Sequence, residues 1–115
     1  FGLSRVQFAT LLPKSITTAI GIGLSKELGG ISDITVAAIT VSGILGNVMA
    51  SKICSLLGIE DPLAVGLSIG TASHALGTVR ALEIGEVEGA MSGLAIVVTG
   101  LLTVLVAPLF MSLIC

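Results

Sequence analysis

Two long stretches of the chain carry almost no charge. The first, residues 34–51, is uncharged and continues to residue 57 with Lys52 near its end. The second, residues 89–115, is also uncharged and holds Pro108 toward its end. About 20 apolar residues in a helix span the hydrocarbon core of a bilayer, and a lysine near a helix end can reach the head groups. We therefore predict membrane-spanning helices over residues 33–57 and 89–115.

Two further apolar segments, residues 8–28 and 63–84, are interrupted by helix-breaking and polar residues. Pro13 and Lys14 fall inside the first, and the second contains several glycines, His74 and Arg80. Proline lacks an N–H donor and glycine is a weak helix former, so we predict a break in each segment. Non-helical backbone at membrane depth persists only where protein buries it or where it lines a wet cavity. The breaks therefore indicate a functional site.

The two halves of the chain resemble each other at an offset of about 56 residues. Ser15, Thr17, Gly21, Glu27 and Gly29 align with Thr71, Ser73, Gly77, Glu83 and Gly85. After one inserted residue, TVSGILGNVMA (40–50) aligns with VVTGLLTVLVA (97–107). We predict an all-α integral membrane fold with two repeats, residues 8–57 and 63–115, in a single membrane domain over residues 1–115. Chance likeness between two apolar sequences is the alternative. The copies are inverted if each crosses the membrane an odd number of times and parallel if even.

Composition supports a membrane environment. Hydrophobic residues make up 54% of the 115 residues and charged residues only 10%, whereas a soluble domain is about 25% charged. The net charge is −2 without a basic block, which argues against a nucleic-acid partner. The cysteines, Cys54 and Cys115, form no CxxC and lack a histidine at ligand spacing, so we interpret them as small apolar residues. Because the sequence begins at Phe1 rather than Met, we expect it to be a piece of a longer chain.

The first break, LLPKSITTAIG (11–21), combines a cation with hydroxyl groups. Proline is suited to the first turn of a helix, so Ser15, Thr17 and Thr18 are expected near a helix N-terminus. Unpaired N–H groups and the helix dipole favour an anion at that end, and Lys14 adds a full positive charge. This arrangement suits a small carboxylate.

The second break, GTASHALGT (70–78), contains the chain's single histidine. Its polar residues, with the arginine that follows, are candidate substrate ligands: Thr71, Ser73, His74, Thr78 and Arg80. Histidine can donate to a carboxylate or carry a proton near neutral pH. Structural alternatives stay open: serine and threonine often bond their own helix or a neighbouring one, His74 can be an interhelical donor, and Lys14 and Arg80 can extend to the membrane surface.

Other polar and small residues of the spanning segments are assigned to packing. Glycines at positions 43, 46, 93 and 100 permit close helix contact, and Asn47 is expected to bond a neighbouring helix. No G-x-S-x-G, HExxH or Walker motif is present, so we expect no enzyme, no catalytic residue, no metal and no cofactor.

At LLPKSITTAIG (11–21), VSGILG (41–46) and GLSIGTASHALGTVRALEIGEVEGAMSGLA (66–95), the chain resembles the LrgB/CidB family of bacterial membrane proteins, which includes YohK-type proteins. The likeness runs from about Phe8 to the end and matches the C-terminal part of family members, which carry further N-terminal helices. Members often have proline where this chain has Ala19 after ITT, so the geometry of the first break can differ here.

The resemblance implies two functions. Members are described as antiholin-like proteins that influence murein hydrolase export and autolysis with a small LrgA/CidA-type membrane partner. A plant relative resembles a glycolate/glycerate translocator, and some bacterial pairs are linked to pyruvate uptake. The residues favour transport, and we expect a multi-pass carrier of small monocarboxylates in the bacterial cytoplasmic membrane that forms homo-oligomers. The alternative is an antiholin-like regulator of murein hydrolase activity.

Overall fold

The structure, a computed structural model, describes residues 2–114 as a bundle of helices. Phe1 and Cys115 lie outside the described residues, and so does the expectation that Cys115 is a small apolar residue of the membrane helix. The elements are α1 (Arg5–Leu11), the 3₁₀ helix η1 (Leu12–Ser15), α2 (Thr18–Glu27), α3 (Ser32–Leu56), α4 (Pro62–Ile84) and α5 (Glu86–Ile114). The prediction of an all-helical chain with two helices able to span a membrane is confirmed.

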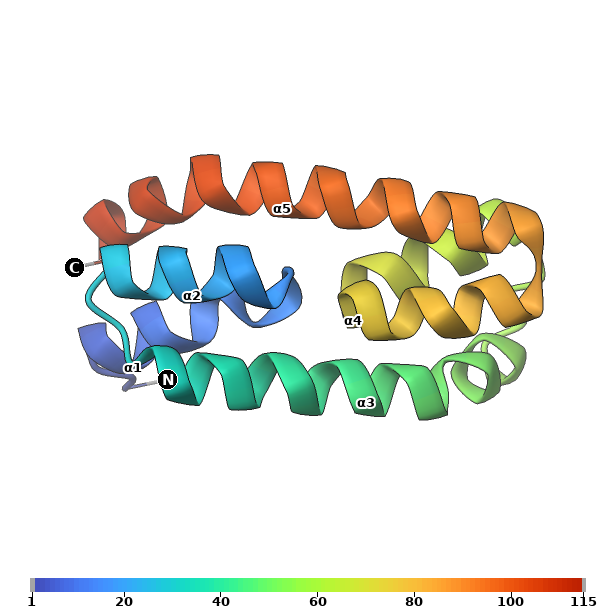
Figure 1. The fold of residues 1–115 in the computed structure, drawn as a ribbon, viewed down its shortest axis with the longest axis horizontal. Helices are drawn as coiled ribbons and strands as arrows, with labels where there is room; N and C mark the ends of the chain where they lie inside the picture. The colour runs from blue at the N-terminus through green and yellow to red at the C-terminus, as the bar shows by residue number, and fades with distance from the viewer. Residues whose placement is uncertain (1, 115) are drawn as a thin grey trace.

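The long helices α3 and α5 form the outer edges of the bundle and run in opposite directions (Figure 1). Their most apolar windows have mean hydropathies of 1.7 and 2.5. α3 matches the span predicted over residues 33–57, whereas α5 begins at Glu86, before the predicted start at residue 89. Glu86 and Glu88 lie in its first turn, where the helix dipole favours carboxylates.

The first interrupted segment forms a hairpin of α1, η1 and α2. Pro13 has non-helical angles (φ −85°, ψ 19°) and Ile16 is extended (φ −115°, ψ 176°), so the helix ends and a new one begins at Thr18. Beyond α2 the chain returns to α1, where the backbone N–H of Ile31 donates to Thr10 Oγ1 at 2.9 Å. The hairpin therefore starts and finishes at the same end of the bundle (Figure 1).

The second interrupted segment, α4, is a hairpin of two helical arms joined at one non-helical residue, His74. Asp61 caps its start by accepting from the N–H of Leu63 at 3.0 Å, and Pro62 occupies the first turn. At His74 the backbone takes φ 43° and ψ −137°, which reverses the chain. The arms, residues 62–73 and 75–84, lie side by side at the end of the bundle opposite the first hairpin (Figure 1).

Two glycines make the turns that reverse the chain after α2 and α3. Gly29 and Gly58 have φ of +82° and +69°, a region that other residues enter only with strain. Beyond each glycine a backbone N–H bonds back to the helix: Gly30 to Ser25 O at 2.7 Å and Ile59 to Cys54 O at 2.9 Å. These bonds satisfy carbonyls that a helix end otherwise leaves free.

Glycines of α3 allow the second hairpin to lie directly against it. A methyl group built on Gly43 would come within 2.6 Å of the His74 ring, and one on Gly46 would collide with the Ser73 side chain. Gly93 has open space around it, and a methyl on Gly100 would meet Ile20 at 3.7 Å, an ordinary contact. The close approach of the helices therefore requires glycine at positions 43 and 46. It does not require glycine at positions 93 and 100, so the expectation that all four glycines permit close helix contact is wrong for these two.

The contact at Gly46 predicts a selective loss of stability. Replacing Gly46→Ala should lower the free energy of unfolding by about 1–3 kcal/mol, because the methyl displaces the hairpin from α3. Gly93→Ala is the matched control and should leave stability unchanged or raise it by up to about 1 kcal/mol through helix propensity. Unfolding of both variants in detergent, followed by circular dichroism, measures the difference. Equal effects at the two glycines would contradict the packing described.

Candidate functional site

The tips of the two hairpins meet the spanning helix α3 at one residue, Ile39. A methyl group built on Gly21, near the start of α2, would lie 2.5 Å from Ile39 Cδ1. From the other hairpin, His74 Nε2 lies 2.8 Å from the Ile39 carbonyl oxygen. η1 also lies against α4 and α5, and Figure 1 shows the two tips facing each other between α3 and α5. The breaks in the two halves of the chain are therefore neighbours in space.

Two side-chain hydrogen bonds connect the tip of the α4 hairpin to α3. Because the Ile39 carbonyl can only accept, His74 Nε2 must carry the proton and donate. Asn47 Nδ2 donates to the backbone oxygen of Leu76 at 2.9 Å. His74 is 3% exposed, so this ring is a buried interhelical donor in the structure.

The same tip contains a strained backbone and a polar atom without a partner. Among residues 2–114, His74 is the only non-glycine residue with positive φ. Its angles resemble the first central position of a type II′ turn, which glycine dominates. Next to it, Ser73 is 1% exposed, and its Oγ is the one buried side-chain oxygen or nitrogen in the described chain without a hydrogen-bond partner. Such outliers cluster at functional sites.

At the first tip, hydroxyl groups and a cation surround the start of α2. Lys14 Nζ donates to Ser15 Oγ at 3.1 Å, and Lys14 is exposed. Thr17 is the residue preceding the helix, and its side chain makes no capping hydrogen bond. Thr18 begins α2 and is exposed. The N-terminal end of α2 therefore combines a lysine with the predicted hydroxyl groups.

The remaining predicted ligands lie along the arms of the α4 hairpin and are already bonded within the protein. Thr71 Oγ1 donates to Leu67 O at 2.7 Å, a bond within its own arm. Thr78 Oγ1 lies 2.7 Å from Ser92 Oγ on α5. Arg80 donates to Ser51 Oγ at 3.0 Å and forms an ion pair with Glu83 at 2.9 Å. Thr78 Oγ1 also lies 3.0 Å from His74 O, so Thr78 adjoins the tip. The structure thus gathers the other predicted residues at the tips and places Thr71 and Arg80 along the arms.

Sequence reasoning missed Ile39, whose carbonyl and side chain contact both tips, because an aliphatic residue in a spanning helix carries no chemical signal. It also missed a buried hydroxyl cluster at the base of the first hairpin. There Thr35 Oγ1 donates to Thr10 O at 2.8 Å and lies 2.7 Å from Ser25 Oγ. Asn47 was expected to bond a neighbouring helix, and it does so at the tip itself.

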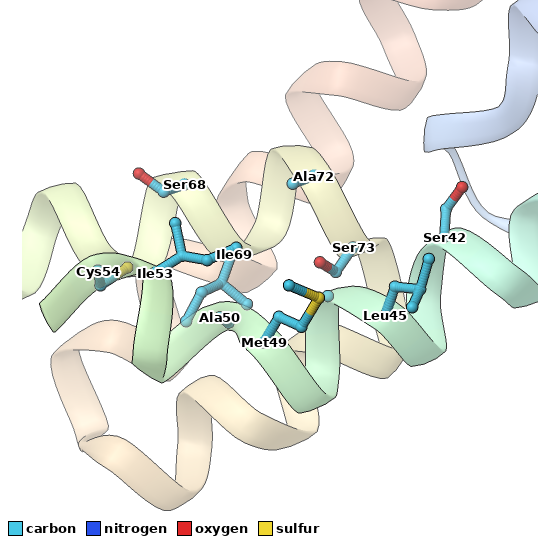
Figure 2. A pocket seen from close by; sticks show the side chains of 11 residues that line it. Ser42, Leu45, Met49, Ala50, Ile53, Cys54, Ser68, Ile69, Ala72 and Ser73 are labelled. Carbon is cyan, nitrogen blue, oxygen red and sulfur yellow. The ribbon is translucent and has the colours of Figure 1, made fainter. Parts of the chain in front are cut away.

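A groove of about 310 Å³ lies between α3 and the first arm of α4, and Ser73 is one of its lining residues. Figure 2 shows Cys54, Ile53 and Ile69 toward one end, with Ser73 and Ser42 toward the other. Apart from its serines, apolar side chains line it. Among residues 2–114, no three His, Cys, Asp or Glu side chains group closely enough to hold a metal ion.

The helices and the broken hairpins place this protein in a class of helical membrane proteins. A model of the LrgB-like family matches residues 1–113, so the chain belongs to the LrgB-like family. No solved structure matches it.

Curated relatives carry two kinds of name. The "Antiholin-like protein LrgB" of Bacillus subtilis is 43% identical over 97% of this chain and 48% of its own length. The "Holin-like protein CidB" of Staphylococcus epidermidis is 41% identical over 94% of this chain and 47% of its own. An "Antiholin-like protein LrgB" of Bacillus mycoides is 38% identical over 96% and 48%. The chain spans about half the length of the curated relatives it matches.

The positive φ at His74 predicts that glycine is more stabilising than alanine at position 74, the reverse of the usual order in a helix. His74→Ala removes the bond to Ile39 and keeps the positive φ, whereas His74→Gly removes the bond and relieves the strain. The glycine variant should therefore be more stable than the alanine variant by about 1 kcal/mol. At Ala90, an exposed position of α5, Ala90→Gly should cost about 1 kcal/mol, the usual helix order. Thermal unfolding of the three variants decides; an alanine variant at 74 more stable than the glycine variant contradicts the geometry.

Proposed function

We propose that this protein is a multi-pass carrier of small monocarboxylates, pyruvate- or glycolate-like, in the bacterial cytoplasmic membrane. The observation that carries the proposal is the meeting of two hairpin tips beside Ile39. At each tip a helix begins: α2 at Thr18, and the second arm of α4 after His74. Discontinuous helices whose N-termini point at an anionic group form the substrate sites of many secondary transporters.

The contacts of the two hairpins support an inverted repeat. Within the first hairpin, a methyl on Gly21 would lie 3.5 Å from Pro13 O; within the second, a methyl on Gly77 would lie 3.2 Å from Ile69 O. Gly77 lies 56 residues after Gly21, and Ile69 lies 56 residues after Pro13. Each unit, a hairpin returning to its own end and then one spanning helix, crosses the membrane once, which is an odd number.

The two halves also exchange contacts in a matching way. The second hairpin rests on α3, where a methyl on Gly43 would lie 2.7 Å from Leu76 Cδ1. The first hairpin rests on α5, where a methyl on Gly100 would lie 3.7 Å from Ile20 Cδ1. Gly100 lies 57 residues after Gly43 and Leu76 lies 56 after Ile20. These corresponding contacts support a structural repeat rather than a chance likeness between the two halves of the sequence.

The chemistry of the tips fits a carboxylate. Two helix N-termini contribute partial positive charge, which favours an anion most strongly where water is scarce. Lys14 supplies the full charge, and the hydroxyl groups of Ser15, Thr17 and Ser73 supply orienting hydrogen bonds. His74 donates one more hydrogen bond or carries the coupled proton. Binding and translocation of this kind need neither an enzymatic step nor a cofactor.

The alternative function is an antiholin-like regulator acting with an LrgA/CidA-type membrane protein. The names of the LrgB relatives are consistent with it. So are the broad apolar faces that α3 and α5 leave exposed, which suit lipid, a partner helix or a second copy of the chain. Val48 and Val97, each 67% exposed, are examples on the two helices. This role depends on helix contacts and leaves the polar tips without a part to play.

Uptake of labelled pyruvate and glycolate into proteoliposomes tests the carrier. The protein, expressed from its whole reading frame, should give saturable uptake that falls at least tenfold in His74→Ala, because a hydrogen bond to a charged group contributes about 1.5–3 kcal/mol. Thr103→Val is the control, since Thr103 Oγ1 bonds its own helix at Thr99 O, and it should retain uptake.

Gly93→Leu separates the two functions. Gly93 lies in open space on α5, so a larger side chain there disturbs a helix partner and leaves the tips intact. A carrier keeps its uptake in this variant. Absence of uptake above empty liposomes, together with loss of autolysis control in Gly93→Leu cells and normal control in His74→Ala cells, would reject the carrier in favour of the regulator.

A further inference from the structure

The hydrogen bond from His74 Nε2 to Ile39 O holds the tip of the second hairpin against α3, and we call it the latch. Its acceptor is a carbonyl oxygen that also takes part in the helical hydrogen bonding of α3. Ile39 lies inside α3, where its oxygen is also the acceptor for the N–H four residues on. Ile39 O therefore keeps a partner when the histidine leaves. His74 Nε2–H, by contrast, has this carbonyl as its acceptor at 2.8 Å. Loss of this bond thus leaves a free donor on His74, whereas Ile39 O keeps its partner within α3.

The two hairpins are held in different ways. The base of the first is fixed by buried hydroxyl bonds, with Thr10, Ser25 and Thr35 each less than 4% exposed. The tip of the second is held by His74 on Ile39 and Asn47 on Leu76. It is also where positive φ and an unpartnered hydroxyl occur together. The strained backbone at His74 and the unpartnered hydroxyl of Ser73 each raise the free energy of this tip in the observed conformation. We therefore expect the tip of the second hairpin to move more readily than the first hairpin.

We propose that the tip of the α4 hairpin is a gate which the substrate carboxylate unlatches. This inference rests on the carrier function proposed above. On release, the carboxylate replaces Ile39 O as the acceptor of His74 Nε2–H and gives Ser73 Oγ its missing acceptor. Hydrogen bonds to an ionised group are about twice as strong as those between neutral groups. The exchange therefore favours the released, substrate-bound tip, and the latch keeps the site closed when no carboxylate is present.

Asn47 is then a positioning residue that holds the gate closed without touching substrate. Its side chain bonds a backbone oxygen of the hairpin, so Asn47→Leu keeps the bulk and removes the bond. One such bond lost raises the fraction of released tip about two- to tenfold. Because substrate binds the released tip, the apparent affinity rises with that fraction, and the KM for pyruvate falls about two- to tenfold. A residue with a purely structural part would raise KM or lower the maximal rate.

Hydrogen exchange followed by mass spectrometry measures the gate itself, on the protein expressed from its whole reading frame. In Asn47→Leu, amides of residues 70–80 should exchange about two- to tenfold faster, with residues 5–27 unchanged. Thr40→Val is the matched control on α3, since Thr40 Oγ1 bonds Val36 O in its own helix, and it should change neither exchange nor KM. Unchanged exchange at the tip in Asn47→Leu would overturn the latch, whether or not the protein transports.

Ser73→Ala is the second variant, and it tests the substrate contact. Its hydroxyl has no partner to lose, so the variant should fold with unchanged or higher stability while its KM for pyruvate rises about tenfold. An unchanged KM would overturn the role of Ser73. If the wild-type protein shows no saturable uptake, the carrier and the substrate contact both fail. Faster tip exchange in Asn47→Leu would then still establish the latch alone.

Discussion

Backbone polar groups that leave a helix inside a bilayer need partners, and this requirement shapes the whole chain. The chain breaks twice, at Pro13–Ile16 and at His74, and neither break lies at an end of the bundle. In the membrane placement that we propose, water is scarce at the depth of the breaks, so each break must be enclosed by protein. α3 and α5 provide the enclosure, and each hairpin folds back on itself so that its arms cover each other.

Two glycines of α3 allow the tip of the second hairpin to pack directly against this helix. Because Gly43 and Gly46 carry no side chains, the His74 ring and Ser73 approach the helix closely enough for Nε2 to reach a backbone carbonyl. The same closeness leaves Ser73 Oγ facing glycine rather than a hydrogen-bonding side chain. The features that make this tip chemically interesting therefore follow from packing: a bonded imidazole, a strained turn and an orphan hydroxyl arise from one tight approach.

Much of the architecture could be predicted from sequence because it depends on length, charge and helix breakers. Uncharged runs of sufficient length predicted α3 and α5, and Pro13 predicted the first break. The second break is less obvious: helical backbone continues on both sides of His74, and the reversal occurs at a histidine rather than at Gly70 or Gly77. Tertiary contacts with α3, which local preferences do not encode, set that turn.

The candidate site was predictable only where chemistry marks a residue. Histidine, lysine and hydroxyl groups in an apolar sequence pointed to the tips. Arg80 gave the same signal, but the structure pairs it with Glu83 and Ser51 along the arm. Ile39 gave none, although both tips contact it, because its contribution is a backbone oxygen and an aliphatic side chain. Membership of the LrgB-like family fits the helices and leaves the choice between transport and regulation to experiment.

The central claim is that the two tips together form one substrate site, and protection of introduced cysteines tests it most directly. Ser15→Cys and Ala75→Cys would each be placed in a background without Cys54 and Cys115, and labelled in membranes with a small polar thiol reagent. The account predicts that saturating pyruvate slows labelling at both positions and leaves Val97→Cys on the exposed side of α5 unaffected. Pyruvate that protects neither tip position, or slows all three equally, would contradict a shared site.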